Sequence, residues 1–314
     1  MDLDFLSFLA DHRSEFLTKV FSAFTFLGSE YAAIGVACLV YWCFNRKMGN
    51  RMLLTLLSSL MLNQLLKILF IARRPWIRDA QKVRTVESAK ADATGYAFPS
   101  GHTSNATAIL GGMVYGRRVK LIWKIIAWVI VALVGFSRMY LGVHTPQDVI
   151  VGVLLSLALI YLMGWVTEKL NEKPSIDIFI CIVTTILAVT TLLITLLRSF
   201  PADHLAEDIA KNKQDVFKLA GASVGMVLGW VLERRLVGFD KPMKVLFGVV
   251  RFVVGIVLVL GIMILTKSPL ISLIGNESWA GVVRYFLSCF VAIFVWPICF
   301  TVLEKKIATS YIKD

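Results

Sequence analysis

Charged residues are scarce in this chain of 314 residues: Asp, Glu, Lys and Arg make up 17% of it, whereas 57% is hydrophobic. The mean hydropathy of +0.74 is too high for an ordinary soluble domain. Several apolar runs approach or exceed the ~20 residues that a helix needs to cross a bilayer. The composition therefore excludes a soluble globular protein. It predicts an all-α, polytopic bundle of transmembrane helices.

The sequence also lacks the cysteine and metal-binding patterns that define many small domains. Its cysteines all fall in apolar segments without CxxC spacing, which indicates small buried hydrophobic residues rather than disulfides or a metal site. They are Cys38, Cys43, Cys181, Cys289 and Cys299. The chain has no HExxH motif, and no DxD-type pair of carboxylates lies near the motifs described below, so we expect no metal and no cofactor.

A cleavable signal peptide and long Pro, Gly or Ser linkers are absent as well. The acidic N-terminal stretch alternates apolar and charged residues at helical spacing, which is typical of a helix on the membrane surface. Composition then shifts near residue 170, where long polar loops give way to short connections. We therefore predict a surface helix at 1–28, a membrane core at 29–168 and a transmembrane extension at 169–314.

Nine membrane spans are expected, so successive connections lie on alternate sides of the membrane. The connections on one side hold 16 Lys and Arg, against 13 on the other, of which three fall in the motifs below. The positive-inside rule then places residues 45–51 in the cytoplasm, and residues 72–100 and 138–146 outside. The same loops account for the net charge of +12 without a nucleic-acid partner. The spans are 29–44, 50–71, 101–117, 121–137, 147–168, 177–198, 216–233, 244–266 and 281–303.

A first group of cations lies in KILFIARRP, residues 67–75. Lys67 and Arg74 are seven residues apart, so we expect both on one helical face, roughly 10 Å apart along the axis. Pro75 is expected to end the helix. Taken alone, the pattern also fits two cations that reach for the membrane interface.

A second motif, GYAFPSGHTSN at 95–105, interrupts the apolar sequence. Ser100 is a natural N-cap, and Gly101 lets a ligand approach the backbone. The unbonded N–H groups of the helix start favour an anion, and His102 lies in the same first turn. The alternative is an ordinary helix cap with a histidine that faces the interface.

The third motif is SRMYLGVHTPQD, residues 137–148. Arg138 ends one span, His144 lies in the following loop, and Asp148 begins the next helix. His144 is a candidate nucleophile or base whose tautomer Asp148 would fix. Asp148 equally fits a capping box that begins at Thr145, and both roles can hold in one geometry.

The combination of the three motifs points to a phosphate site. Three fixed cations and a helix N-terminus form a cage for a multiply charged oxyanion. Two of the chain's four histidines fall in this group, so one can attack phosphorus while the other protonates the leaving oxygen.

The motifs resemble the K-x6-RP, PSGH and SR-x5-H-x3-D signatures of the type 2 phosphatidic acid phosphatases, the PAP2 superfamily. Every defining position matches in order, and the resemblance covers roughly residues 15 to 168. It implies a helical bundle with its site at the outer membrane interface and no metal requirement. His144 would form a phosphohistidine, Asp148 would orient it, and His102 would protonate the leaving group. The phosphate-binding residues would be Lys67, Arg74, Ser100, Gly101 and Arg138.

The substrate class implied is a lipid phosphate or diphosphate, such as phosphatidate, phosphatidylglycerophosphate, a sphingoid phosphate or undecaprenyl diphosphate. Nine spans and an outward N-terminus equally suit the glucose-6-phosphatase branch, which acts on a small polar phosphomonoester. A third alternative is a lipid or anion transporter on a phosphatase scaffold. Membrane lipids are the only partners that the sequence indicates.

Two further sets of residues raise separate hypotheses. Arg251 and Arg284 lie inside predicted spans, where they either extend to the interface or line a cavity for an anionic headgroup. Arg73, Trp76 and Tyr140 flank the motifs, where they either contact the substrate or, as we favour, act as interfacial anchors.

Overall fold

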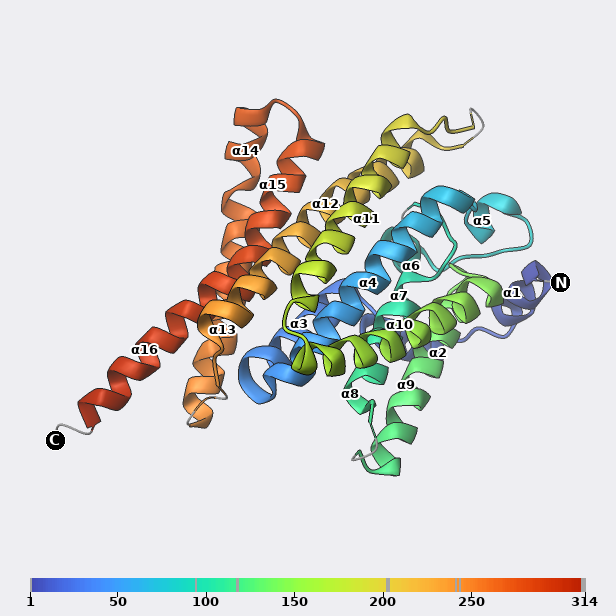
Figure 1. Ribbon diagram of the computed structural model, residues 1–314. Coiled ribbons are helices and arrows are strands. Elements are labelled where there is room, and N and C mark those ends of the chain that lie inside the picture. The colour runs from blue at the N-terminus through green and yellow to red at the C-terminus, as the bar shows by residue number, and fades with distance from the viewer. Residues whose placement is uncertain are drawn as a thin grey trace. The chain divides into compact units, whose positions relative to one another are not determined.

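The computed structural model describes residues 2–93, 95–116, 119–201, 204–240, 242 and 244–311. Every regular element in this described part is helical (Figure 1). Seven of the helices are long and apolar enough to cross a membrane, or up to eight if the bent pair Glu15–Phe26 and Glu30–Phe44 counts as one span. The predicted all-α membrane bundle is confirmed. Its four C-terminal candidates are Ile176–Leu197, Ala206–Val237, Val245–Ile274 and Glu277–Ile307.

The span expected at residues 101–117 is not among the candidate membrane spans of the described residues. Helix α7 (Gly101–Ala106) continues through a π-helical turn (Thr107–Gly111) into α8 (Gly112–Val114), and the backbone turns extended at Tyr115. This run is shorter than the ~20 residues that cross a bilayer. It serves instead as a short helix inside the bundle, with most of its residues buried.

The described chain packs as two compact units. The first comprises Met1–Ala37, Arg51–Glu168 and Leu197–Lys213, and it contains all three motifs. The second comprises Cys38–Asn50, Lys169–Leu196 and Gln214–Asp314. The N-terminal helices thus pack into the first unit, and a short segment of the C-terminal half returns to it. The predicted division at residues 28 and 168 stays a prediction.

Helix α9 (Leu121–Tyr140) organises the first unit, because α1 (Asp2–Asp11), α2 (Glu15–Phe26) and α7 all contact it (Figure 1). Its buried positions recur at helical spacing: Ala127, Val131, Val134 and Arg138. The apolar stripe therefore fixes the rotation of α9 and turns Arg138 inward. The other helices that contribute to this unit are α3 (Glu30–Leu39), α4 (Arg46–Phe70), α5 (Pro75–Arg78), α6 (Glu87–Asp92) and α10 (Pro146–Glu172).

The N-terminal helix α1 has specific contacts that the sequence analysis did not anticipate. Leu6 is fully buried. The acidic face of the helix pairs with the end of α5 and with the loop that follows it, through Asp2–Arg78 at 2.8 Å, Asp4–Lys82 at 2.8 Å, and Asp11–Arg84. Tyr140 accepts a hydrogen bond from the Ser14 amide on its hydroxyl and is 3% exposed, so its interpretation as an interfacial anchor was wrong.

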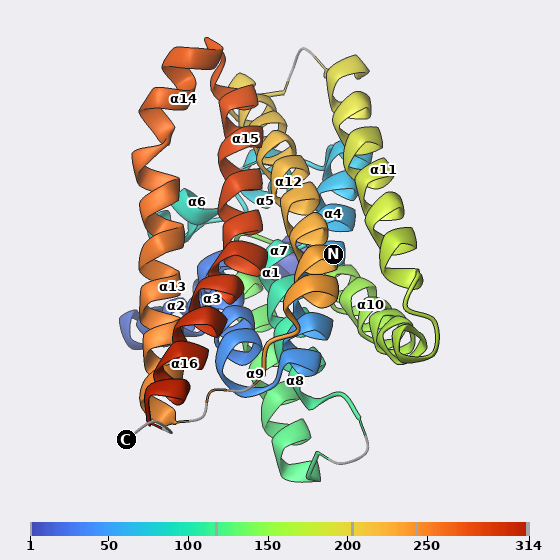
Figure 2. The same ribbon diagram turned by 60° about the vertical axis from the view of Figure 1, so that its left-hand side comes forward.

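The second unit is built on α13 (Val245–Leu265), which contacts α14 (Lys267–Ile274) and α15 (Glu277–Phe290) (Figure 2). A π-helical turn (Val291–Val295) joins α15 to α16 (Trp296–Tyr311). Helices α11 (Ile176–Leu197) and α12 (Ala206–Leu232) supply the remaining spans.

Arg251 in α13 is a structural residue of this unit rather than part of an anion site. Its guanidinium donates to both carboxylate oxygens of Glu304, at 2.6 and 2.7 Å. It also donates to the backbone carbonyls of Trp42 and Asp240. With 3% exposure and its donors occupied, Arg251 has no capacity left for a headgroup.

Arg284 in α15 differs, because its Nε is buried without a hydrogen-bond partner in the described structure. The side chain lines a narrow crevice together with Lys267 and Glu277. The hypothesis of an anionic headgroup stays a prediction for Arg284.

Replacing Arg251 should destabilise the protein much more than replacing Arg284. We expect Arg251→Gln to lower the free energy of unfolding of the purified protein by about 3–5 kcal/mol, because it leaves Glu304 unpaired. Arg284→Gln is the matched control and should change it by less than about 1 kcal/mol, since no ion pair is broken. Denaturation in detergent followed by circular dichroism measures both, and an equal loss in the two variants contradicts this account.

Candidate active site

Arg74 lies in the connection between α4 and α5, not in a continuation of α4. Helix α4 ends at Phe70, where Ile71 adopts a left-handed backbone with φ of 43°, and residues 71–74 form a non-helical connection to the start of α5. The residue before a proline avoids helical backbone, and Arg74 accordingly has ψ of 148° before Pro75. The expectation that Lys67 and Arg74 share a helical face was therefore wrong.

The non-helical backbone at 71–74 lies beside the glycine-containing loop of the second motif. The Ala97 amide donates to the Ala72 carbonyl at 2.8 Å, and Arg74 Nε donates to the Gly95 carbonyl at 2.8 Å. Gly95 has φ of +71°, which a residue with a side chain rarely adopts. These contacts bring the first and second motifs together.

The start of α7 follows, with Ser100 at the predicted N-cap position. Its hydroxyl pairs with the Thr103 hydroxyl at 3.0 Å and makes no capping hydrogen bond to the helix backbone. A Cβ built on Gly101 would meet nothing nearer than Asn63 Oδ1 at 4.0 Å, so protein packing does not require a glycine there. The open space beside Gly101 and the uncapped N–H groups together suit a bound anion.

Arg138 is fully buried beneath this helix start and is only partly satisfied. One terminal nitrogen donates to the Thr25 hydroxyl of α2 at 2.6 Å. Its Nε and its second terminal nitrogen have no hydrogen-bond partner among the described residues. Because an unpaired buried donor costs about 1–3 kcal/mol, this arrangement favours an acceptor that arrives from outside the protein.

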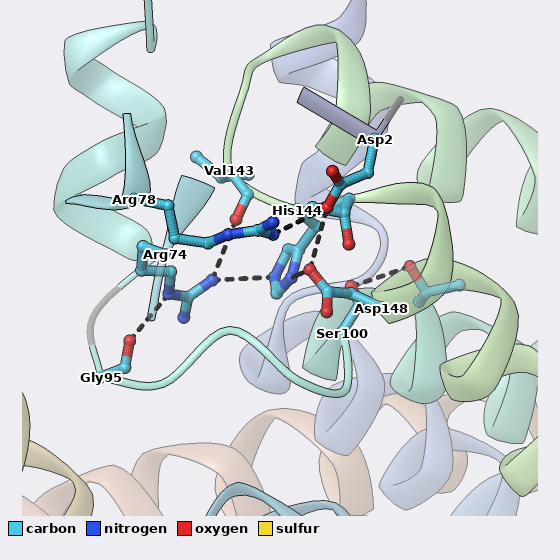
Figure 3. A network of polar contacts seen from close by, with 10 residues as sticks. Asp2, Arg74, Arg78, Gly95, Ser100, Val143, His144 and Asp148 are labelled. Atoms are coloured by element: carbon cyan, nitrogen blue, oxygen red, sulfur yellow. Dashed lines mark hydrogen bonds and ion pairs between the residues drawn. The ribbon is translucent and has the colours of Figure 1, made fainter. Parts of the chain in front are cut away.

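His144 is held between a cation and a carboxylate (Figure 3). Its Nε2 lies 3.0 Å from a terminal nitrogen of Arg74, and its Nδ1 lies 3.4 Å from Asp148 Oδ2. The same Asp148 oxygen accepts the Thr145 amide at 2.8 Å, which is one of the two hydrogen bonds of the predicted capping box. Arg74 can only donate, which assigns the proton to Nδ1 and the lone pair to Nε2.

The protonation state of His144 follows from its surroundings. Burial, followed by the positive charge of Arg74, lowers the pKa of His144 from its ordinary value to about 3, although Asp148 opposes the shift. Without a bound ligand, the His144 imidazole is therefore neutral, and its Nε2 lone pair faces Arg74.

The remaining predicted residues lie close to this centre. His102 is in the first turn of α7, within electrostatic reach of Arg138, His144, Arg74 and Lys67. Lys67 is half-buried in the last turn of α4. Three contact residues were missed by the sequence analysis: Thr25, Gly95 and Asp208, whose carboxylate accepts the Gly95 amide at 3.2 Å. In the described part of the chain, no group of three His, Cys, Asp or Glu side chains could hold a metal ion.

The low pKa of His144 makes protein stability depend on pH. The pKa of His144 is lower in the folded than in the unfolded state, so the unfolded chain takes up a proton first as the pH falls. The contribution of neutral His144 to the free energy of unfolding is therefore complete above pH 6.5 and is lost as the pH falls toward 3. Lowering the pH from 7 to 5 should therefore cost wild type on the order of 2 kcal/mol more than His144→Gln, which cannot titrate. Thermal midpoints in detergent test this, and parallel pH dependence in the two proteins contradicts it.

Comparison with known proteins identifies the family. The PAP2 superfamily matches residues 49–172, and the PAP2 superfamily phosphatase transmembrane extension matches residues 217–309. Undecaprenyl-diphosphatase BcrC of Bacillus subtilis (strain 168) is 30% identical over 167 residues, which cover 51% of this chain and 80% of that protein. Phosphatidylglycerophosphatase B of the same strain is 32% identical over 173 residues, with the same two shares. No solved structure matches the chain. The chain therefore belongs to the PAP2 superfamily and is a membrane phosphatase that hydrolyses phosphate esters.

Proposed function

We propose that the protein hydrolyses a lipid phosphate or lipid diphosphate through a phosphohistidine on His144, without a metal ion. The observation that carries the proposal is the orientation of the His144 ring. Asp148 lies at its Nδ1, and its Nε2 lone pair is directed toward the buried guanidinium of Arg74. A nucleophile that faces a cation is placed to attack an anion held by that cation.

Substrate binding rests on cations at three points of the site. The unpartnered donors of Arg138 are available to phosphate oxygens, and Arg74 can move its donor from His144 to the same oxygens. Lys67 adds charge, while Ser100 and the Gly101 amide at the start of α7 add neutral donors. The bound anion also relieves the repulsion between Arg74 and Arg138.

The reaction then proceeds in two displacements. The bound phosphate anion offsets the neighbouring cations, so His102 takes up a proton as the substrate binds. The Nε2 lone pair of His144 forms a bond to phosphorus while the bond between phosphorus and the leaving oxygen breaks, and protonated His102 gives that oxygen its proton. In the second step water attacks phosphorus, His102 takes a proton from the water, and the bond between Nε2 and phosphorus breaks. Inorganic phosphate leaves, and Asp148 stabilises the positive charge on the imidazole between the two steps.

The substrate class follows from the relatives and from the surroundings of the site. One relative is named for a polyprenyl diphosphate and another for phosphatidylglycerophosphate, and both of these molecules are lipids that carry a terminal phosphate. The uneven distribution of Lys and Arg between the connections supports a site on the outer face of the cell membrane.

A screen of phosphate release tests the proposal and its alternatives. We expect the purified protein to release phosphate from undecaprenyl diphosphate, phosphatidylglycerophosphate or phosphatidate, and far more slowly from glucose 6-phosphate. His144→Ala should abolish release, because the attacking lone pair is removed. His12→Ala is the matched control, since His12 is exposed in the N-terminal region, and it should retain wild-type turnover.

Two results of this screen, and one result of a separate transport assay in vesicles, contradict the proposal. Wild-type turnover in His144→Ala excludes the phosphohistidine. Preference for glucose 6-phosphate favours the small polar phosphomonoester. Lipid or anion movement across vesicles that persists without His102 and His144 favours the transporter.

Arg138 gives a second, quantitative test of the same site. Arg138→Lys keeps the charge but replaces a planar fork of donors with a single ammonium, so we expect kcat/KM to fall by about 10²–10³. Thr25→Val leaves the guanidinium in place and should cost less than about tenfold. Steady-state kinetics on one lipid phosphate measure both, and equal activity of Arg138→Lys and wild type contradicts phosphate binding by the guanidinium.

A further inference from the structure

Residues 197–213 form a segment of the C-terminal half that packs into the first unit. The segment comprises the connection after α11 and the first two turns of α12, and it lies between the two family matches, outside both. Its described residues make several contacts with the catalytic half: Arg198 with the Leu69 carbonyl, His204 with the Tyr96 hydroxyl, Asp208 with the Gly95 amide, and Asn212 with Gln64.

The contact of Asp208 leads directly to the catalytic centre. Asp208 Oδ1 accepts the Gly95 amide at 3.2 Å, and the Gly95 carbonyl accepts Arg74 Nε at 2.8 Å. Arg74 in turn lies 3.0 Å from His144 Nε2. Figure 3 shows the contacts from Gly95 through Arg74 to His144. Because Gly95 is held from both sides, it connects Asp208 to the guanidinium that faces the nucleophile.

The loop around Gly95 depends on such outside contacts for its position. It is irregular backbone with a left-handed residue, and it has no helix or sheet hydrogen bonds of its own at Gly95. A Cβ at Gly95 would lie 2.5 Å from Asn212 Nδ2, so the loop and the segment are in close contact. Tyr96, 2% exposed, also stacks on Phe200 with ring centroids 6.4 Å apart.

We propose that Asp208 is a positioning residue of the active site, which acts through Gly95 on the orientation of Arg74. The proposal rests on the proposed function, because it assigns Arg74 to the phosphate. The carboxylate fixes the Gly95 amide, and the peptide then presents its carbonyl to Arg74 Nε. With Nε fixed in this way, a terminal nitrogen of Arg74 lies 3.0 Å from His144 Nε2 and donates to the Val143 carbonyl at 3.2 Å. Small displacements of such a cation cost large factors in rate.

Kinetics of three variants test the proposal. Asp208→Ala should lower kcat on the lipid phosphate found in the screen by about 10- to 100-fold, with KM changed by less than about threefold. Asp208→Asn should recover most of the loss, because its amide oxygen still accepts from Gly95. Glu207→Ala is the matched control: it removes the neighbouring, exposed carboxylate and should stay within about twofold of wild type.

A double-mutant cycle separates positioning from a general structural role. If Asp208 acts through Arg74, adding Asp208→Ala to Arg74→Lys should lower kcat by less than about twofold further. Independent, multiplicative losses overturn the proposal. So does unchanged kcat in Asp208→Ala, or a loss explained entirely by a smaller folded fraction.

Two readouts do not require turnover, and they distinguish this proposal from the proposed function. Amide hydrogen exchange of the peptide that contains Gly95 should accelerate in Asp208→Ala and not in Glu207→Ala. The rise in thermal midpoint caused by orthovanadate should also shrink in Asp208→Ala alone. Should wild type release no phosphate from any substrate, the proposed function fails, whereas these measurements still support or overturn the anchoring of Arg74.

Discussion

The positive charge buried at the junction of the three motifs is the constraint on which the rest of the first unit depends. Arg138 is fully buried with two nitrogens unpartnered, and Arg74 uses one of its donors on a neutral imidazole. Such an arrangement is costly in the free protein. It is kept in place by apolar packing along α9, by the hydroxyl of Thr25 and by the carbonyls of the glycine loop. The energy that folding supplies is thus used to hold donors ready for an anion, which is how enzymes stabilise charge that develops during a reaction.

The residues of the candidate site could be predicted from the sequence because each motif carries its own local chemistry. The capping box at Thr145 and Asp148 needs only four consecutive residues, and the structure forms its bond between the Thr145 amide and the Asp148 carboxylate. The N-cap position of Ser100 is equally local. What the short motifs could not supply is the backbone path between them. Ile71 leaves the helix four residues before the proline, so the helical spacing of Lys67 and Arg74 gave the wrong geometry.

Contacts between distant segments could not be predicted from the sequence for a different reason. Asp208 lies 113 residues after Gly95, and nothing in its surroundings distinguishes it from the adjacent Glu207. The pairing of α1 with the loop after α5 is similar, since scattered acidic residues on an amphipathic helix are usually solvated. Tyr140 was misinterpreted because an aromatic residue at the end of a span is most often an interfacial anchor. Each of these assignments depends on which surfaces the folded chain brings together.

Two buried arginines show how a structural charge differs from a functional one. Arg251 and Arg138 have the same side chain, similar burial and similar apolar neighbours in sequence. Arg251 has a bidentate carboxylate and two carbonyls, so its donors are consumed inside the protein. Arg138 has one hydroxyl and two empty positions. Burial of a charge inside a membrane protein therefore does not by itself mark a binding site. The deciding property is the number of donors that the protein leaves unsatisfied, because only those are available to a substrate.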